Sequence, residues 1–185
     1  MNILSSGASS SVAGSLPLLA DWDQRSLRQA LGRFATGVTI VTTRRPDGSC
    51  VGLTANSFNS VSLDPALVLW CLGKGQGSSA VFRSSTHFAI NILSSEQVEL
   101  SRRFASPIED RFAGVDYACD DVAAPLIRGC AAWFVCRHRV HHEVGDHVLF
   151  IGEVEAFGTA AEQPLLFCDG SYAVPESMSR AACSR

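Results

Sequence analysis

The chain has 185 residues, 46% of them hydrophobic, and a formal net charge of −3. A core of about 150 residues buries roughly 68–70% of its unfolded surface, which is enough for a stable fold without disulfides or metals. The acidic balance argues against a nucleic-acid partner, which would favour a basic face. A mean hydropathy of +0.16 indicates extra apolar surface for a ligand or a second subunit.

The two ends differ in composition from the middle of the chain. Residues 1–20 are rich in Ser, Gly and Ala and lack the basic start of a signal peptide, and the apolar stretch 16–20 is too short to span a bilayer. We therefore expect disordered tails at 1–20 and 176–185, one domain at 21–175, and no membrane partner. The seven cysteines form no CxxC pair, which favours a reducing cytoplasm.

The first expected element is a helix over 23–34. Leu27, Ala30, Leu31 and Phe34 recur at i, i+3, i+4 and i+7, and Asp23 can cap the start. The β-branched run 38–43 then predicts a strand, the Pro-Asp-Gly sequence in 45–48 predicts a turn, and 50–55 predicts the second strand of a hairpin.

The remaining elements are mostly strands. The continuous apolar run 66–72 predicts a strand buried on both faces, and a Gly-rich loop at 73–77 leads into a short helix at 79–83. A strand at 87–93 precedes a helix opened by Ser95 and Glu96, and further strands are expected at 130–140, 148–157 and 165–167. Strands outnumber helices about two to one, which predicts a mainly β fold, an antiparallel barrel with peripheral helices.

Two polar segments are candidate binding sites. The Thr, Asn and Ser side chains of 52–62 offer neutral donors and acceptors suited to a flat heterocycle with carbonyls and ring nitrogens, although an ordinary turn has the same composition. The segment 73–79 could hold a phosphate through glycine amides and Lys74, but it lacks the P-loop order and is equally compatible with a flexible loop.

The histidines near the C-terminal half suggest two kinds of chemistry. His138, His141, His142 and His147 have spacings that could bind zinc, but adjacent strand residues point to opposite faces, so His141 and His142 cannot share one ion without a bulge. Asp146 could instead hold His147 in one tautomer beside a reacting group, the alternative being a solvated turn histidine.

Five motifs occur in the order found in one family. The segments 27–42, 52–58, 60–65, 87–93 and 145–147 resemble the flavin-reductase-like, FMN-binding split-barrel proteins, and 111–115 and 170–172 add support. The resemblance covers about residues 23–175 and implies an antiparallel Greek-key split β-barrel that forms a homodimer.

The resemblance also implies an activity. A cytoplasmic NAD(P)H:flavin oxidoreductase would transfer hydride from NADH to FMN or FAD and supply reduced flavin to a flavin-dependent monooxygenase. NADPH is the less favoured donor because no arginine cluster for a 2′-phosphate can be placed. No G-x-G-x-x-G follows a strand, so NADH would stack on the flavin. The alternatives are a flavin-bound reductase of ferric iron or a corrin, a non-catalytic flavin-binding module, and a metal-binding barrel.

The family's functional positions map onto this chain residue by residue. His147 would be the catalytic proton donor on the nicotinamide side, where Tyr172 would also lie. The sequence Gln76-Gly77-Ser78 departs from the family's usual pattern and leaves the choice between FMN and FAD open. The flavin contacts implied are Thr54, Ala55, Asn56, Ser57, Ser60, Val61, Ser62, Cys71, Lys74, Ser78, Ser79 and Phe112.

Overall fold

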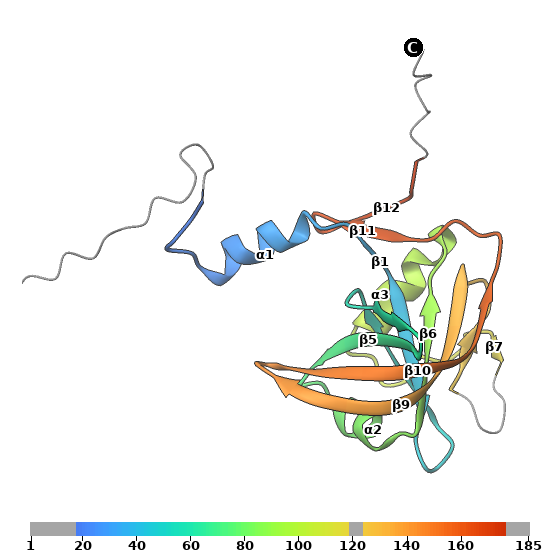
Figure 1. The fold of residues 1–185 in the computed structure, drawn as a ribbon. Helices are drawn as coiled ribbons and strands as arrows, with labels where there is room; N and C mark the ends of the chain where they lie inside the picture. The colour runs from blue at the N-terminus through green and yellow to red at the C-terminus, as the bar shows by residue number, and fades with distance from the viewer. Residues whose placement is uncertain (1–17, 119–123, 177–185) are drawn as a thin grey trace, which may run out of the picture.

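The structure is a computed structural model that describes residues 18–118 and 124–176 (Figure 1), so the tails predicted to be disordered lie almost wholly outside the described residues. Seven strands form one antiparallel sheet in the order β3-β2-β6-β9-β10-β5-β4. Their bounds are β2 (Thr39–Arg44), β3 (Cys50–Ala55), β4 (Asn59–Leu63), β5 (Ala66–Gly73), β6 (His87–Ile92), β9 (Ala132–Val144) and β10 (His147–Thr159).

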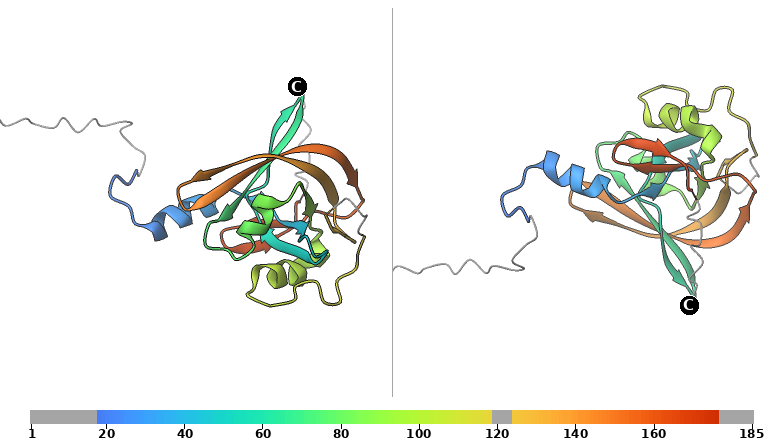
Figure 2. Two further views of the ribbon diagram at one scale, coloured as in Figure 1. Left: turned by 90° about the horizontal axis from the view of Figure 1, so that it is seen from below. Right: turned by 90° about the horizontal axis from the view of Figure 1, so that it is seen from above.

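The smaller elements lie around this sheet, which curls into a barrel split between β3 and β5 (Figure 2). The remaining strands are β1 (Thr36–Gly37), β11 (Leu166–Cys168) and β12 (Ser171–Ala173), which form a three-stranded sheet, and β7 (Tyr117–Ala118) with β8 (Leu126–Ile127). The helices are α1 (Gln24–Gly32), α2 (Ser79–Ser84), the 3₁₀ turn η1 (Ser95–Gln97) and α3 (Val98–Ala105). The predicted antiparallel barrel with few helices is confirmed. None of the described helices has the length and apolar character needed to cross a bilayer.

The first hairpin has the predicted strands and turn. β2 pairs with β3 from Thr39 opposite Ala55 to Arg44 opposite Cys50. Gly48 closes the turn with a φ of 85°, a conformation that glycine adopts without steric cost. Because β2 is also paired with β6, this hairpin is fixed in the sheet on its other edge. The end of β3, where the polar segment begins, is therefore held in place.

β5 differs from its prediction. Val68, Trp70 and Leu72 are buried, but the intervening Leu67, Leu69 and Cys71 are only half-buried, so the prediction of burial on both faces is wrong. The inner residues pack into the barrel, where the Trp70 ring stacks on Phe150 with centroids 4.6 Å apart. No described element of this chain fully covers the outer face of β5.

The helices show two further differences. Asp23 caps α1 through a capping box with Ser26, as its position predicts, yet no residue of α1 is buried. Figure 1 shows α1 projecting from the barrel, with its apolar stripe uncovered by its own chain. The helix expected to open at Ser95 does begin there, but as the 3₁₀ turn η1, which is capped by a reciprocal pair of Ser94 with Gln97 and becomes α-helical only from Val98.

Candidate functional site

A cavity of about 280 Å³ lies at the split of the barrel, where β3 and β5 face α3. Ligand clefts and cavities usually measure roughly 300–1,000 Å³, so this cavity lies just below the usual range for a small-molecule site. Its lining residues are Leu53, Thr54, Ala55, Asn56, Ser57, Cys71, Leu72, Gly73, Gln76, Phe104, Ala105, Arg111 and His147. The strand end and the histidine turn, predicted separately as candidate sites, thus meet in one place.

The segment after β3 gives this cavity neutral hydrogen-bonding groups. Thr54 donates its hydroxyl to the Ser101 carbonyl at 2.7 Å, and Ser57 bonds to the backbone of Cys71. Within the described chain the Asn56 carboxamide forms no hydrogen bond, so its donors and acceptor remain available to a ligand. Leu72 and Phe104 supply buried apolar wall. This combination fits a flat heterocycle, as the sequence predicts.

His147 opens β10 at the mouth of the cavity and is oriented by its neighbour. Its Nδ1 lies 2.7 Å from an Asp146 carboxylate oxygen, and this hydrogen bond lowers the pKa of Asp146. The Lys74 amide donates to the Asp146 carbonyl at 2.9 Å, which attaches the turn to the Gly-rich loop. Because a carboxylate only accepts, Nδ1 carries the proton, and the neutral ring presents a lone pair at Nε2.

Lys74 and Ser79 do not line the cavity but stabilise the segments beside it. The Lys74 ammonium lies 3.0 Å from Glu143, which also pairs with Arg83 at 2.6 Å, and these two cations lower the pKa of Glu143. Ser79 is buried and its hydroxyl accepts from the Arg83 Nε at 3.3 Å. Neither residue lines the cavity. Their contacts instead hold the Gly-rich loop and α2 against the end of β9.

A second pocket of about 210 Å³ adjoins the first, and Gln76 and Arg111 line both. Ser78 and Phe112 line this second pocket. The Arg111 guanidinium donates to the carbonyls of Gly52 at 2.9 Å and Ser106 at 3.0 Å, so it stands fixed between the two spaces. The sequence analysis did not name Arg111 as a site residue. The family motif at 111–115 is the feature that could have identified it.

The structure therefore gathers most of the residues implied by the resemblance. The first cavity contains Thr54, Ala55, Asn56, Ser57, Cys71 and His147, and the second contains Ser78 and Phe112. Ser60, Val61 and Ser62 lie on β4, in the hairpin that projects from the barrel in Figure 2, and line neither space. Tyr172 lies on β12 behind α3, where its hydroxyl contacts Ser101 at 2.9 Å.

The histidines of β9 form a pair and not a larger cluster. A bulge in β9 places His138 opposite Gly152 and Val140 opposite Ile151, and as a result His138 Nε2 lies 3.2 Å from His141 Nδ1. Burial and the nearby His138 lower the pKa of His141. In the described ranges 18–118 and 124–176, no group of three or more His, Cys, Asp or Glu residues is placed to hold a metal ion.

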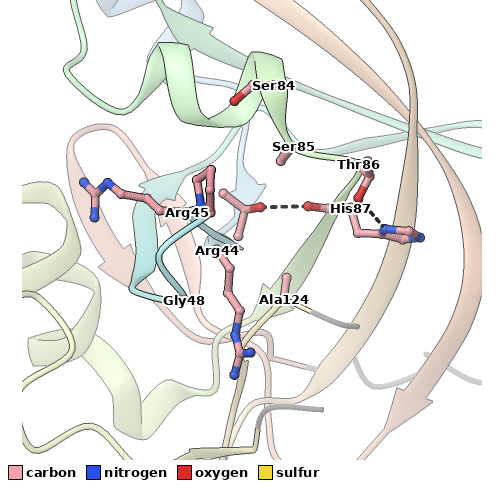
Figure 3. Close-up of a pocket in the computed structure, with 10 residues that line it drawn as sticks. Arg44, Arg45, Gly48, Ser84, Ser85, Thr86, His87 and Ala124 are labelled. Carbon is pink, nitrogen blue, oxygen red and sulfur yellow. Dashed lines mark hydrogen bonds between the residues drawn. The ribbon is translucent and has the colours of Figure 1, made fainter. Parts of the chain in front are cut away.

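Another cavity, of about 370 Å³, lies between the β2–β3 turn and the start of β6 (Figure 3). Its hydroxyl groups already have partners: Thr43 donates to the His87 carbonyl at 2.8 Å, and Thr86 contacts the His87 ring at 3.0 Å. The Arg44 and Arg45 side chains extend in different directions and do not converge on it. The cavity at the barrel split is therefore the better candidate site.

A split antiparallel barrel whose cavity has neutral hydrogen-bonding groups beside a carboxylate-oriented histidine fits the class of flavin-binding reductases. Residues 31–175 match the family described as the flavin reductase like domain. The chain is 44% identical over 163 residues to the stachydrine N-demethylase reductase subunit Stc3 of Rhizobium meliloti (strain 1021), covering 88% of this chain and 71% of that one. It is 43% identical over 150 residues to the FMN reductase (NADH) SmoA of Agrobacterium fabrum, covering 81% and 85%.

Among solved structures, the NADH:FAD oxidoreductase SgcE6 of Streptomyces globisporus C-1027, in complex with NAD and FAD fragments, superposes with a TM-score of 0.77 at 36% identity. That match covers 86% of this chain and 95% of SgcE6. This chain spans about half the length of two further curated relatives, 51% and 50%. The chain belongs to the flavin reductase like family, which confirms the family resemblance seen in the sequence.

Proposed function

We propose that this protein reduces FMN or FAD with NADH and supplies the reduced flavin to a monooxygenase. The observation that carries the proposal is the cavity at the barrel split, where the neutral groups after β3 and the Asp146–His147 pair face one space. Relatives of this chain are named as reductase subunits, including the reductase component of the flavin-dependent trigonelline monooxygenase of Acinetobacter baylyi, which is 46% identical over 155 residues.

The two adjoining pockets suit the parts of a flavin. When bound, the flavin supplies the hydride-accepting ring, so the protein's main task is to orient two ring systems. Thr54, Asn56 and the amides that follow β3 would hold the ring edge in the first cavity. Arg111, fixed by two carbonyls, would face the phosphate-bearing tail at the passage to the second pocket. Orientation of reacting groups can contribute roughly 7–11 kcal/mol to lowering a barrier.

His147 would act on the nicotinamide side of the same cavity. Its proton at Nδ1 is held by Asp146, which leaves Nε2 to accept from, or when the ring is protonated to donate to, a group in the cavity. A positioned proton donor typically contributes about 10²–10⁴-fold, or roughly 3–5 kcal/mol. This is less than orientation contributes, so we assign His147 chiefly to placing the nicotinamide.

The uncovered apolar surface supports a homodimer. Leu27 and Leu31 in α1 and Phe34 shortly after it are 40%, 64% and 76% exposed, and the outer face of β5 is only half-buried. Isolated apolar residues are common on protein surfaces, but a continuous stripe indicates a contact. We expect sedimentation velocity to show a dimer, and Leu31→Asp to shift it to a monomer. A monomeric wild-type chain would contradict the dimer.

The cysteines agree with a reducing compartment such as the cytoplasm. The five cysteines within the described residues are all free thiols. Cys130 and Cys136 are buried, and burial raises the pKa of each to about 12, which keeps them as inert, uncharged core residues. Burial also raises the pKa of Cys71 in the cavity wall. A thiol in this state packs against a ligand and does not react with it.

The activity is tested by following NADH absorbance with purified protein and FMN, FAD or no added flavin. We expect oxidation that rises with added flavin and saturates, with the lower KM identifying the preferred flavin. Parallel assays with NADPH test the choice of donor. A protein that binds flavin but oxidises neither NADH nor NADPH would be a non-catalytic flavin module. Flavin retained through turnover would favour reduction of another acceptor by the bound flavin.

A further inference from the structure

Tyr172 lies outside the cavity, in contact with α3. It stands in the middle of β12, where its ring contacts Phe167 in β11 with centroids 5.4 Å apart, and the Arg102 guanidinium lies 5.6 Å above the ring. It is not among the residues that line either pocket. Direct contact with the nicotinamide, which the family resemblance implies, is therefore not the role that this position suggests.

A chain of two hydrogen bonds links Tyr172 to the cavity. The Tyr172 hydroxyl lies 2.9 Å from Ser101 Oγ, and Ser101 is fully buried in α3. The carbonyl of the same Ser101 accepts the Thr54 hydroxyl at 2.7 Å. Thr54 is a cavity residue, so a residue of the C-terminal hairpin is joined through one buried serine to the proposed flavin site.

This arrangement fixes what Thr54 presents to a ligand. A hydroxyl has one proton and two lone pairs, and the proton of Thr54 is committed to the helix carbonyl. Thr54 can therefore accept from an N–H of a bound ring but cannot donate to a ring carbonyl. Ser101 shares α3 with Phe104 and Ala105, which form the cavity wall, so any shift of Ser101 moves that wall as well.

We propose that Tyr172 is a positioning residue for the flavin, which acts by holding Ser101 so that Thr54 faces the ring as a hydrogen-bond acceptor. The proposal rests on the proposed function, because it takes the flavin ring to occupy the cavity at the barrel split. Tyr172 contributes to flavin affinity without touching the flavin. Loss of the Tyr172 side chain lowers the affinity for flavin first, and nicotinamide binding is affected only as a consequence.

The test is a flavin-binding measurement, independent of turnover. Wild-type protein, Tyr172→Phe, Ser101→Ala and the double variant are titrated with FMN and with FAD, and flavin fluorescence gives the dissociation constant. Tyr172→Phe removes only the hydroxyl, and Ser101→Ala removes only the partner hydroxyl while keeping the carbonyl that binds Thr54. Ser84→Ala, which removes a hydroxyl bonded to a helix carbonyl in α2 and lies in neither pocket, is the matched control.

We expect each single variant to raise the flavin dissociation constant by about three- to tenfold, the effect of one neutral hydrogen bond. The double variant should match the single variants, because both break the same link. Ser84→Ala should bind flavin as wild type does, and Tyr172→Phe should keep the wild-type KM for NADH at saturating flavin.

Three results would overturn this role. Unchanged flavin affinity with a raised KM for NADH would place Tyr172 against the nicotinamide. Unchanged affinity with a lower Tm would make the contact structural only. Losses that add in the double variant would mean that the two hydroxyls act separately. If the wild-type protein itself failed to bind flavin, the proposed function would fail as well. If wild type binds flavin and any of the three results above is found, only the role of Tyr172 fails.

Discussion

The Ser57 hydroxyl forms two hydrogen bonds with the backbone of Cys71, accepting from its amide at 2.9 Å and donating to its carbonyl at 3.2 Å. Ser57 follows β3, and Cys71 lies in β5 beyond the last residue paired with β4, so one side chain bridges the split of the barrel. Both residues also line the cavity. The bridge therefore ties together the two segments that line this side of the cavity.

We expect Ser57→Ala to lower the free energy of unfolding by about 1–2 kcal/mol, because the two half-buried backbone groups of Cys71 lose their partner. Flavin affinity should fall as well, since the cavity wall is released. Urea unfolding and flavin titration measure the two effects. The control is Ser171→Ala, at an exposed serine whose hydroxyl forms no hydrogen bond within the described chain. Wild-type stability and affinity in Ser57→Ala would show that the bridge is dispensable.

Arg111 lies between the two pockets with its guanidinium held by the carbonyls of Gly52 and Ser106. Arg111→Met removes the charge and both contacts, and we expect flavin affinity to fall by about tenfold or more, as charge-assisted hydrogen bonds are the stronger ones. Arg128→Met, at an exposed arginine paired with Asp116, is the control. An unchanged dissociation constant for both FMN and FAD would remove Arg111 from the proposed site.

Much of the fold could be predicted because local patterns and tertiary packing agree. The β-branched residues of β2 and the Pro-Asp-Gly turn act over a few residues and predicted the first hairpin correctly. β4 was not predicted as a strand, since 59–63 continue the polar segment after β3 and alternate over only two apolar residues, Val61 and Leu63, which are both exposed. The helical segment that opens at Ser95 was predicted, but the capping pair of Ser94 with Gln97 was not, because it depends on the side-chain conformation of Gln97.

The site was predictable where its residues are close in sequence. The segment Thr54–Ser57 and the pair Asp146–His147 were found because each is a compact polar motif after a strand or in a turn. Arg111 depends on a carbonyl 59 positions away, and the link from Tyr172 to Ser101 spans 71 positions. Contacts of this kind depend on how the elements pack, which the pattern of one segment does not encode.

Gly152 marks a place where β10 passes close to the barrel core. A Cβ at this position would lie 2.4 Å from Phe88 Cζ and 2.9 Å from Cys136 Cβ, both in the buried core. We expect Gly152→Ala to destabilise the protein by about 1–3 kcal/mol through overpacking. Gly158→Ala in the same strand is the control, because its Cβ would meet nothing closer than Trp133 at 3.6 Å. Equal urea midpoints for the two variants would contradict the close packing.

Glu143 makes stability depend on pH. Hydrogen bonds from Arg83 and Lys74 lower its pKa below the ordinary value of 4.5, so the folded state binds the proton more weakly than the unfolded state. The stabilisation is therefore present above about pH 4.5 and is lost as the pH falls through the lower folded pKa. Glu143→Gln should lower Tm at pH 7, and the difference from wild type should shrink below pH 4. A difference that is constant with pH would show that the charge is not involved.

His147 should affect NADH more than flavin. Its Nδ1 is engaged by Asp146, so Nε2 is the atom available at the cavity, and His147→Ala removes it without changing the groups after β3. We expect kcat/KM for NADH to fall by up to about 10²-fold while the flavin dissociation constant stays within about twofold.

Asp146→Ala should cause a smaller loss of kcat/KM, because the His147 ring remains but its tautomer and orientation are no longer held. His142→Ala, at an exposed histidine of β9 that does not line the cavity, is the control. Steady-state assays that vary NADH at saturating flavin measure kcat/KM, and flavin titration measures the dissociation constant. Wild-type turnover in His147→Ala would remove this residue from the reaction.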